Sequence, residues 1–152
     1  MRVSAKTDYA LRAAVELAAA GGDAPVKGER LATSQSIPLR FLENILLQLR
    51  HAGIVESRRG AEGGYKLARP AEDITLADVI RAIDGPLAGV SGARPETLDF
   101  TGVAEPMRDV WIAVRASLRG VLEGVTLADV IGGGLPQHVR DLVADEDAWV
   151  PH

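Results

Sequence analysis

Apolar residues recur with helical spacing in the first fifty residues and predict three helices. The first covers residues 4–20, with Ser4 as its cap, and a short second helix covers residues 27–34. Pro38 suits the first turn of a third helix over residues 38–51. This third helix has one apolar stripe and a polar outer face; the stripe comprises Leu42, Ile45, Leu46 and Leu49. The second and third helices, joined by a tight turn, are typical of a helix-turn-helix.

Two short segments after the third helix have strand character. Residues 54–58 and 65–68 flank a glycine-rich tip with a basic shoulder, residues 59–64. They predict a β-hairpin. A hairpin directly after such a helix is the wing of a winged helix-turn-helix.

The hexapeptide Thr-Leu-Ala-Asp-Val-Ile occurs twice, at residues 75–80 and 126–131. Threonine followed by aspartate three residues later is an acidic variant of the capping box, so each copy should begin a short helix. The similarity does not extend beyond the six residues, and it therefore does not indicate a repeat architecture.

A long helix is expected over residues 103–124, after a Gly- and Pro-containing loop at residues 85–106. Its apolar residues alternate in steps of four and three and form a heptad-type seam, which comprises Met107, Trp111, Val114, Leu118, Val121 and Val125. The helix must bury this seam against the winged domain or against a second copy of the chain. Beyond it, residues 132–152 read as a glycine-rich and then acidic tail with a mobile end.

The predicted fold is thus mainly α with a small β-hairpin. It comprises a winged helix-turn-helix domain (1–84), a loop (85–106), the long helix with a short following helix (103–131) and a C-terminal tail (132–152). The chain has no apolar run near the roughly 20 residues that a membrane span needs, and its start lacks a signal peptide. We therefore expect a cytoplasmic protein without membrane contact.

The net charge of −4 conceals an asymmetry along the chain. Residues 1–69 contain 11 Lys and Arg against 7 Asp and Glu, a net charge of +4. Residues 70–152 contain 6 against 14, a net charge of −8. The basic half could approach phosphates, whereas the acidic half would be repelled by them.

Candidate catalytic and metal chemistry is sparse. The chain has no cysteine, which excludes disulfides, cysteine nucleophiles and thiolate metal sites. His51, His138 and His152 match no zinc-ligand spacing, and the carboxylates occur singly on helices. The glycine-rich tip lacks the Gly-Lys-Ser/Thr ending of a phosphate-binding loop. We expect no enzyme, no metal and no cofactor.

The outer face of the third helix carries side chains that can read bases. Asn44 could read adenine, Arg40 guanine or a phosphate, and Glu43 a cytosine amino group. On the hairpin, Arg58 and Arg59 could contact phosphates or enter the minor groove. A solvated helix face is the simpler alternative for the first set.

Other side chains also have a structural interpretation. Arg58 could pair with Glu56 or another neighbour. Trp111 is better explained as a core or interface anchor than as a ligand-stacking residue. Tyr9 and Phe41 could pack between the first and third helices, with the Tyr9 hydroxyl free to meet a phosphate.

Four segments together resemble the Rrf2 family of bacterial transcription regulators, which includes the iron–sulfur cluster regulator, the nitric-oxide-sensing repressor and the cysteine-metabolism repressor. They are residues 1–10, 37–50, 53–67 and 74–84, and a weaker match continues to Ile131. The resemblance implies a homodimer whose long helices cross and whose winged domains bind a palindromic operator. We expect a repressor; the alternative is a protein-interaction module that keeps the fold without binding DNA.

The resemblance also implies roles for individual residues. Arg40, Glu43 and Asn44 would face bases, and Arg59 with Gly60 would lie at the minor groove. The expected DNA contacts are Ser4, Lys6, Tyr9, Pro38, Arg40, Phe41, Glu43, Asn44, Gln48, Arg50, Arg58, Arg59, Gly60, Gly63, Gly64 and Tyr65. Where the wing of family members usually has a Pro-Gly pair, this chain has Ala61 and Glu62. Glu62 would add a negative charge close to the DNA.

A larger departure lies at residues 85–106, where cluster-binding relatives keep three cysteines and this chain has none. Asp8 matches a position that supplies an extra cluster ligand in some relatives, but a single carboxylate cannot hold a cluster without thiolates. We therefore expect a cluster-free member of the family. Its signal could be a small molecule in a cleft near Trp111, a protein partner, or nothing beyond its own abundance.

Overall fold

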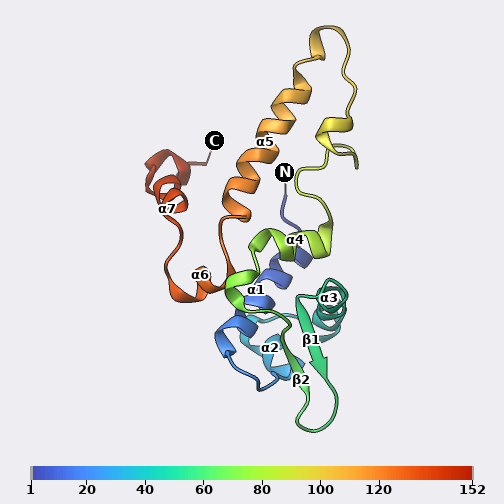
Figure 1. The fold of residues 1–152 in the computed structure, drawn as a ribbon, viewed down its shortest axis with the longest axis vertical. Coiled ribbons are helices and arrows are strands. Elements are labelled where there is room, and N and C mark those ends of the chain that lie inside the picture. The colour runs from blue at the N-terminus through green and yellow to red at the C-terminus, as the bar shows by residue number, and fades with distance from the viewer. Residues whose placement is uncertain (1, 152) are drawn as a thin grey trace.

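A computed structural model describes residues 2–151 and consists of helices with one two-stranded sheet (Figure 1). The elements are α1 (Ala5–Ala20), α2 (Gly28–Gln35), α3 (Leu39–His51), β1 (Val55–Arg58), β2 (Gly64–Leu67), α4 (Leu76–Asp84), α5 (Met107–Leu122), α6 (Leu127–Gly132) and α7 (Gln137–Ala144). Short 3-10 turns lie at Ala71–Asp73, Pro95–Thr97, Gly102–Ala104 and Glu146–Trp149. The predicted fold class, mainly helical with one hairpin, is confirmed.

The core lies where α1 crosses the other helices of the N-terminal domain. Ala10, Ala13 and Ala14 of α1 are fully buried, and such small side chains let neighbouring helices approach closely. The predicted apolar stripe of α3 is also fully buried, in the same hydrophobic cluster; it comprises Leu42, Ile45, Leu46 and Leu49. Because one face of α3 is buried so completely, its opposite face is left on the surface.

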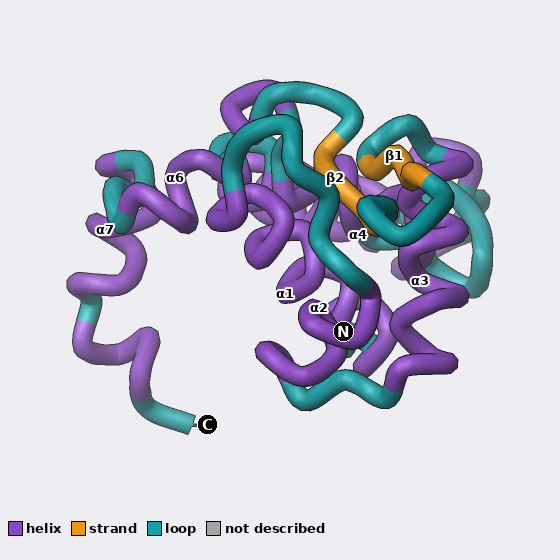
Figure 2. The backbone as a smooth tube through the Cα atoms, turned by 90° about the horizontal axis from the view of Figure 1, so that it is seen from below, coloured by secondary structure: helices purple, strands orange, loops and turns teal. Residues whose placement is uncertain are grey.

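β1 and β2 pair antiparallel, with Val55 opposite Leu67 and Arg58 opposite Gly64, as the sequence predicts for a hairpin. A third short segment adds to this ribbon. The N–H of Val26 donates to the carbonyl of Tyr65, and the N–H of Tyr65 donates to the carbonyl of Val26, both at 2.8 Å. The hairpin (strands orange in Figure 2) is therefore tied, close to its tip, to the segment that leads into α2.

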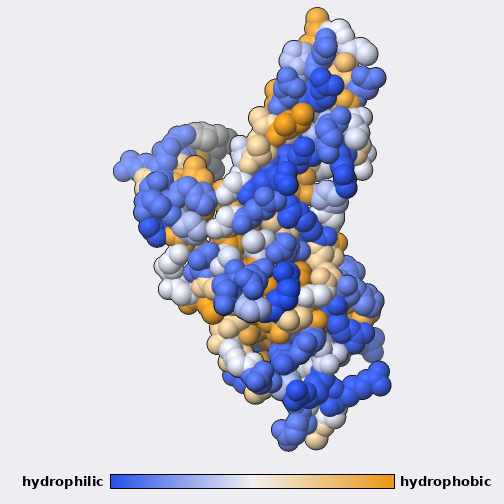
Figure 3. Space-filling model, viewed as in Figure 1, coloured by the Kyte–Doolittle hydropathy of each residue, from blue (hydrophilic) through white to orange (hydrophobic). Residues whose placement is uncertain are grey.

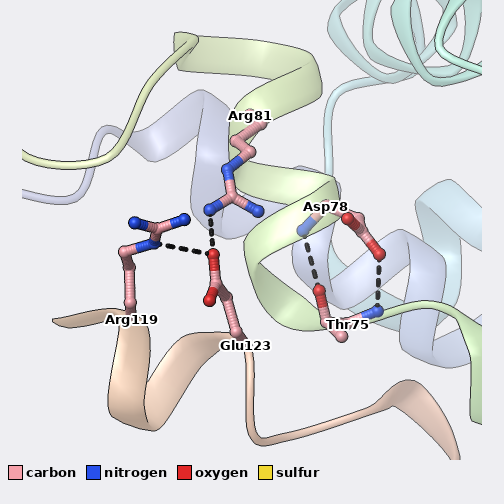
Figure 4. Close-up of polar contacts among 5 residues, drawn as sticks. All are labelled: Thr75, Asp78, Arg81, Arg119 and Glu123. Carbon is pink, nitrogen blue, oxygen red and sulfur yellow. Dashed lines mark hydrogen bonds and ion pairs between the residues drawn. The ribbon is translucent and has the colours of Figure 1, made fainter. Parts of the chain in front are cut away.

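Both copies of the repeated hexapeptide begin helices through complete capping boxes, as expected. In each copy the threonine hydroxyl accepts from the aspartate N–H, and the aspartate carboxylate accepts from the threonine N–H (Figure 4 shows the first copy). The backbone N–H of Asp129 lies 3.1 Å from the Thr126 hydroxyl. The hydrogen bond from the Thr126 backbone lowers the pKa of the Asp129 carboxyl, so the box keeps its charge at neutral pH.

α5 projects from the rest of the chain as an arm, and no residue of α5 is buried (Figure 1). Apolar side chains lie among hydrophilic ones on its surface (Figure 3). The helix is shorter than predicted, since residues 103–106 precede it. Val125, predicted as part of the seam, lies beyond the helix and is only 2% exposed within its own chain, so that prediction is wrong. The turn after Leu122 directs Val125 into the core instead.

Residues 132–151, predicted as a tail, contain a helix and a 3-10 turn. Pro136 precedes α7, and Val139 of this helix is buried. The His138 ring nitrogen Nε2 lies 2.9 Å from the Gly120 carbonyl oxygen, which links α7 to α5. Among residues 2–151, the structure contains no helix with the length and apolar character of a membrane span.

Thr7, the buried polar residue of α1, gives a test of this packing. Its hydroxyl donates to the Asp84 carboxylate at 2.5 Å and accepts from the Ser4 hydroxyl at 3.0 Å. Thr7→Val removes both of these hydrogen bonds, so we expect the free energy of unfolding to fall by about 1–3 kcal/mol. Urea denaturation followed by circular dichroism measures this change.

Thr33→Val is the matched control, because the exposed Thr33 hydroxyl bonds only within its own helix, to the Glu29 carbonyl. It should change the stability by no more than about 0.5 kcal/mol. Equal losses in the two variants would contradict a tie between α1 and α4 through Thr7.

Candidate nucleic-acid interface

The turn between α2 and α3 fixes how α3 is presented. Ser36 adopts a left-handed backbone conformation (φ 54°), which ends α2, and the N–H of Ile37 donates to the Ala32 carbonyl at 2.9 Å. Ile37 is buried. Arg12 of α1 donates to the Gln35 carbonyl at 3.0 Å and holds the turn from the other side. The predicted helix-turn-helix is therefore present and rigidly connected to α1.

The outer face of α3 is open to solvent. Arg40, Glu43 and Asn44 are exposed, as is Pro38 at the helix N-terminus. Gln48 is half-buried one turn after Asn44, and its Nε2 lies 3.5 Å from Asn44 Oδ1. The three predicted base-reading side chains thus share one uncovered surface, which is the placement that DNA contact requires.

Tyr9 and Phe41 adopt the packing considered from the sequence. Their rings meet edge to face, with centroids 5.7 Å apart, and the Arg12 guanidinium lies 4.8 Å from the Tyr9 ring centroid. Phe41 remains 39% exposed. Asp8 forms an ion pair with Arg12 at 2.8 Å. The N-terminal turns of α1 are therefore attached to the edge of α3, and Asp8 is engaged in the same cluster.

The hairpin presents its basic tip at the end of the molecule away from the α5 arm (Figure 1). Arg58, Arg59 and Gly60 are exposed there. Lys27, which the sequence analysis did not select, donates from Nζ to the Ala61 carbonyl at 2.6 Å and braces the tip. Only its place just before α2 could have suggested this role, since nothing in the sequence links residue 27 to residue 61.

The charges around the hairpin leave its arginines unpaired. Glu56 pairs with Lys66 at 3.1 Å, and this hydrogen bond raises the pKa of the Lys66 ammonium, which stays charged at neutral pH. Within residues 2–151, Arg58 and Arg59 make no ion pair. The alternative pairing of Arg58 with Glu56 is therefore not formed.

Several predicted contact residues also have a structural role. Ser4 caps α1 and contacts Asp84, and Arg50 donates to the Ser57 hydroxyl at 3.1 Å. Gly63 is buried, and Tyr65 pairs through its backbone with Val26. Lys6 is half-buried on α1. These positions surround the surface formed by α3 and the hairpin tip; their contact with DNA stays a prediction.

The chain is similar to named transcriptional regulators over most of its length. A family model named Rrf2 and described as an iron-dependent transcriptional regulator matches residues 3–133. Rv1287 of Mycobacterium tuberculosis, which is named an HTH-type transcriptional regulator, is 52% identical over 145 residues, which are 95% of this chain and 90% of that protein. CymR of Bacillus subtilis is 35% identical over 86% of this chain and 89% of its own length.

Two solved structures share the fold. The structure of CymR, described as the global cysteine regulator of B. subtilis, gives a TM-score of 0.75 at 33% identity and covers 88% of this chain and 98% of that one. The structure of T. potens IscR gives a TM-score of 0.69 at 34% identity and covers 100% of this chain and 93% of that one.

The iron in the description of the family model does not fit the side chains of this chain. Iron–sulfur clusters are held chiefly by cysteine thiolates, and the sequence has none. Residues 85–106 offer only carboxylates (Glu96, Asp99 and Glu105), and Asp8 is paired with Arg12. Among residues 2–151, no three His, Asp or Glu side chains form a group that could hold a metal ion.

Gly64→Ala tests whether the close approach of Gly64 to Val26 sets the position of the hairpin. A Cβ at this residue would lie 2.4 Å from the Val26 carbonyl oxygen, and the backbone there has φ +150°. We expect the substitution to lower the free energy of unfolding by about 1–3 kcal/mol because it forces β2 away from Val26. Thermal denaturation measures the loss.

Gly132→Ala serves as the control, since a Cβ at Gly132 meets nothing within 4 Å. Its stability should stay within about 0.5 kcal/mol of the parent or rise slightly. A Gly64→Ala protein as stable as the Gly132→Ala protein would show that the close approach of β2 and Val26 does not constrain the hairpin.

Proposed function

The chain belongs to the Rrf2 family of HTH-type transcriptional regulators, and we propose that it binds a specific DNA operator as a homodimer. Family membership confirms the resemblance drawn from the four sequence segments. The observation that supports DNA binding is the exposed face of α3 beside a hairpin tip whose arginines have no ion pair. This proposal includes no iron–sulfur cluster.

The outer face of α3 has the dimensions and chemistry for the major groove. A helix of 13 residues is about 20 Å long, and the groove is about 12 Å wide. Arg40, Glu43 and Asn44 are exposed polar side chains on this face, and each can recognise a different base edge. Arg59 at the hairpin tip would then lie against the adjacent minor groove.

The α5 arm supports the homodimer. Its seam residues remain at least partly exposed in the single chain; they are Met107, Trp111, Val114, Leu118 and Val121. Burying an apolar face of this kind stabilises association, and a second copy offers the same face. Two-fold symmetry of the dimer implies a palindromic operator. A dimer that occupies a promoter excludes polymerase, so we propose repression as its mode of action.

Arg59→Ala tests the hairpin contact. The operator fragment would first be found by a genome-wide binding map of the tagged protein, and its affinity would then be measured by fluorescence anisotropy over a range of salt concentrations. We expect the substitution to weaken binding by about 1–3 kcal/mol and to reduce the salt dependence, because one phosphate or groove contact per subunit is lost.

Arg140→Ala removes the same charge from α7, far from the hairpin, and should leave the affinity unchanged. Equal affinities of the two variants would contradict the hairpin contact. A map without enriched fragments would instead favour the protein-interaction module.

Leu118→Glu tests the dimer. It places a charge on the half-buried seam of α5, and we expect the sedimentation coefficient to fall from that of a dimer to that of a monomer. Ser117→Glu adds the same charge one residue away, on an exposed position of the same helix, and should leave the dimer intact. A dimeric Leu118→Glu protein would exclude α5 as the main contact.

A further inference from the structure

A pocket with a volume of about 410 Å³ lies between the end of α4, the loop that follows it, and α5. Residues 70–152 carry a net charge of −8 and contain only six positive side chains, all arginine. Four of those six line this one pocket; they are Arg81, Arg94, Arg115 and Arg119. The positive charge of the acidic half is thus concentrated in one place.

The four guanidinium groups come from three separate segments. Arg81 lies on α4, Arg94 lies in the loop, and Arg115 and Arg119 lie one turn apart on α5. Leu87 and Pro95, both buried, add an apolar wall. Because the fold brings these segments together, the arrangement depends on tertiary structure and not on a run of basic sequence.

Two carboxylates compensate part of this charge. Glu96 pairs with Arg115, and a single oxygen of Glu123, Oε1, contacts both Arg81 and Arg119 (Figure 4). The hydrogen bonds that these two arginines donate to Glu123 lower the pKa of its carboxyl group. The pKa of Glu96 is lowered first by the hydrogen bond from its own backbone N–H and then by Arg115. Both carboxylates are therefore ionised at neutral pH.

The balance of the pocket remains positive. Four guanidinium groups face two carboxylates, which leaves a net charge of +2. Within residues 2–151, Arg94 makes no hydrogen bond through its side chain and no ion pair, although it lines the same pocket. Although the charge of Glu96 lies near it, a guanidinium group with no hydrogen bond or ion pair, beside three that share two carboxylates, is suited to receive an anion from solution.

We propose that this pocket binds a small organic polyanion, whose carboxylate or phosphate oxygens are held by Arg94 and by the arginines of α4 and α5. Guanidinium groups bind such oxygens with paired hydrogen bonds, and pockets of roughly 300–1,000 Å³ accommodate small ligands. Such a ligand would join α4, which is part of the winged domain, to α5, which carries the seam. If the chain is the operator-binding dimer proposed above, the ligand sets the position of one relative to the other and acts as an effector.

Isothermal titration calorimetry with citrate and pyrophosphate, at constant ionic strength, tests the site and separates carboxylate from phosphate recognition. We expect at least one of these probes to bind with a dissociation constant below about 1 mM. Arg94→Ala should weaken that binding about tenfold or more, since a charged hydrogen-bond donor is lost. Because the exposed Arg94 side chain makes no hydrogen bond or ion pair within residues 2–151, the variant should keep the parent's circular dichroism spectrum and melting temperature.

Arg108→Ala removes an exposed arginine from the same helix but outside the pocket, and should bind the probe as the parent does. Equal weakening in both variants, or no binding of either probe at about 1 mM, would overturn the proposal.

Operator binding is measured separately without the probe. Loss of the anion site with intact operator binding refutes only this inference, whereas absence of operator binding refutes the proposed function and leaves the calorimetry to decide on the pocket.

Discussion

The relation between the winged domain and the α5 arm depends on one short backbone junction. The N–H of Leu76 donates to the Val125 carbonyl at 3.0 Å, and the N–H of Leu127 donates to the Ile74 carbonyl at 2.9 Å. These two bonds pair the starts of the twin hexapeptides, so two capping boxes and two helix starts meet at one place. Val125 and Leu127 are buried beside it. The chain that leaves the winged domain at α4 is thereby returned to it after α5.

Beyond this junction, the α5 arm is attached through ion pairs and partly buried side chains. No residue of α5 is fully buried. Its ion pairs to other segments join Arg115 to Glu96 of the preceding loop, and Arg81 of α4 to Glu123 just after α5. Exposed ion pairs of this kind contribute little to stability and are sensitive to competing ions. The arm is therefore fixed firmly at its base and weakly along its length. The hydrophobic core, by contrast, is formed by α1, α3 and their neighbours and contains no residue of α5.

The parts of the structure that local sequence dictates were predictable, and those that depend on distant contacts were not. The stripe of α3, the hairpin and both capping boxes follow from spacing within one segment, and the structure confirms them. The heptad pattern continued through Val125 although the helix ends at Leu122, because nothing in the pattern shows that the chain turns back to the core. The Lys27 brace and the arginine pocket join residues far apart in the chain, and no local signal reports such contacts.

The loop between α4 and α5 connects the winged domain to the α5 arm. Cluster-binding members of the family keep cysteines in the segment that corresponds to residues 85–106, as the sequence resemblance implies, whereas here that segment supplies Arg94 and Glu96. Thiolates would recruit a metal cluster, and guanidinium groups recruit oxyanions. In the ligand site proposed above, replacing one by the other would change which signal the loop receives.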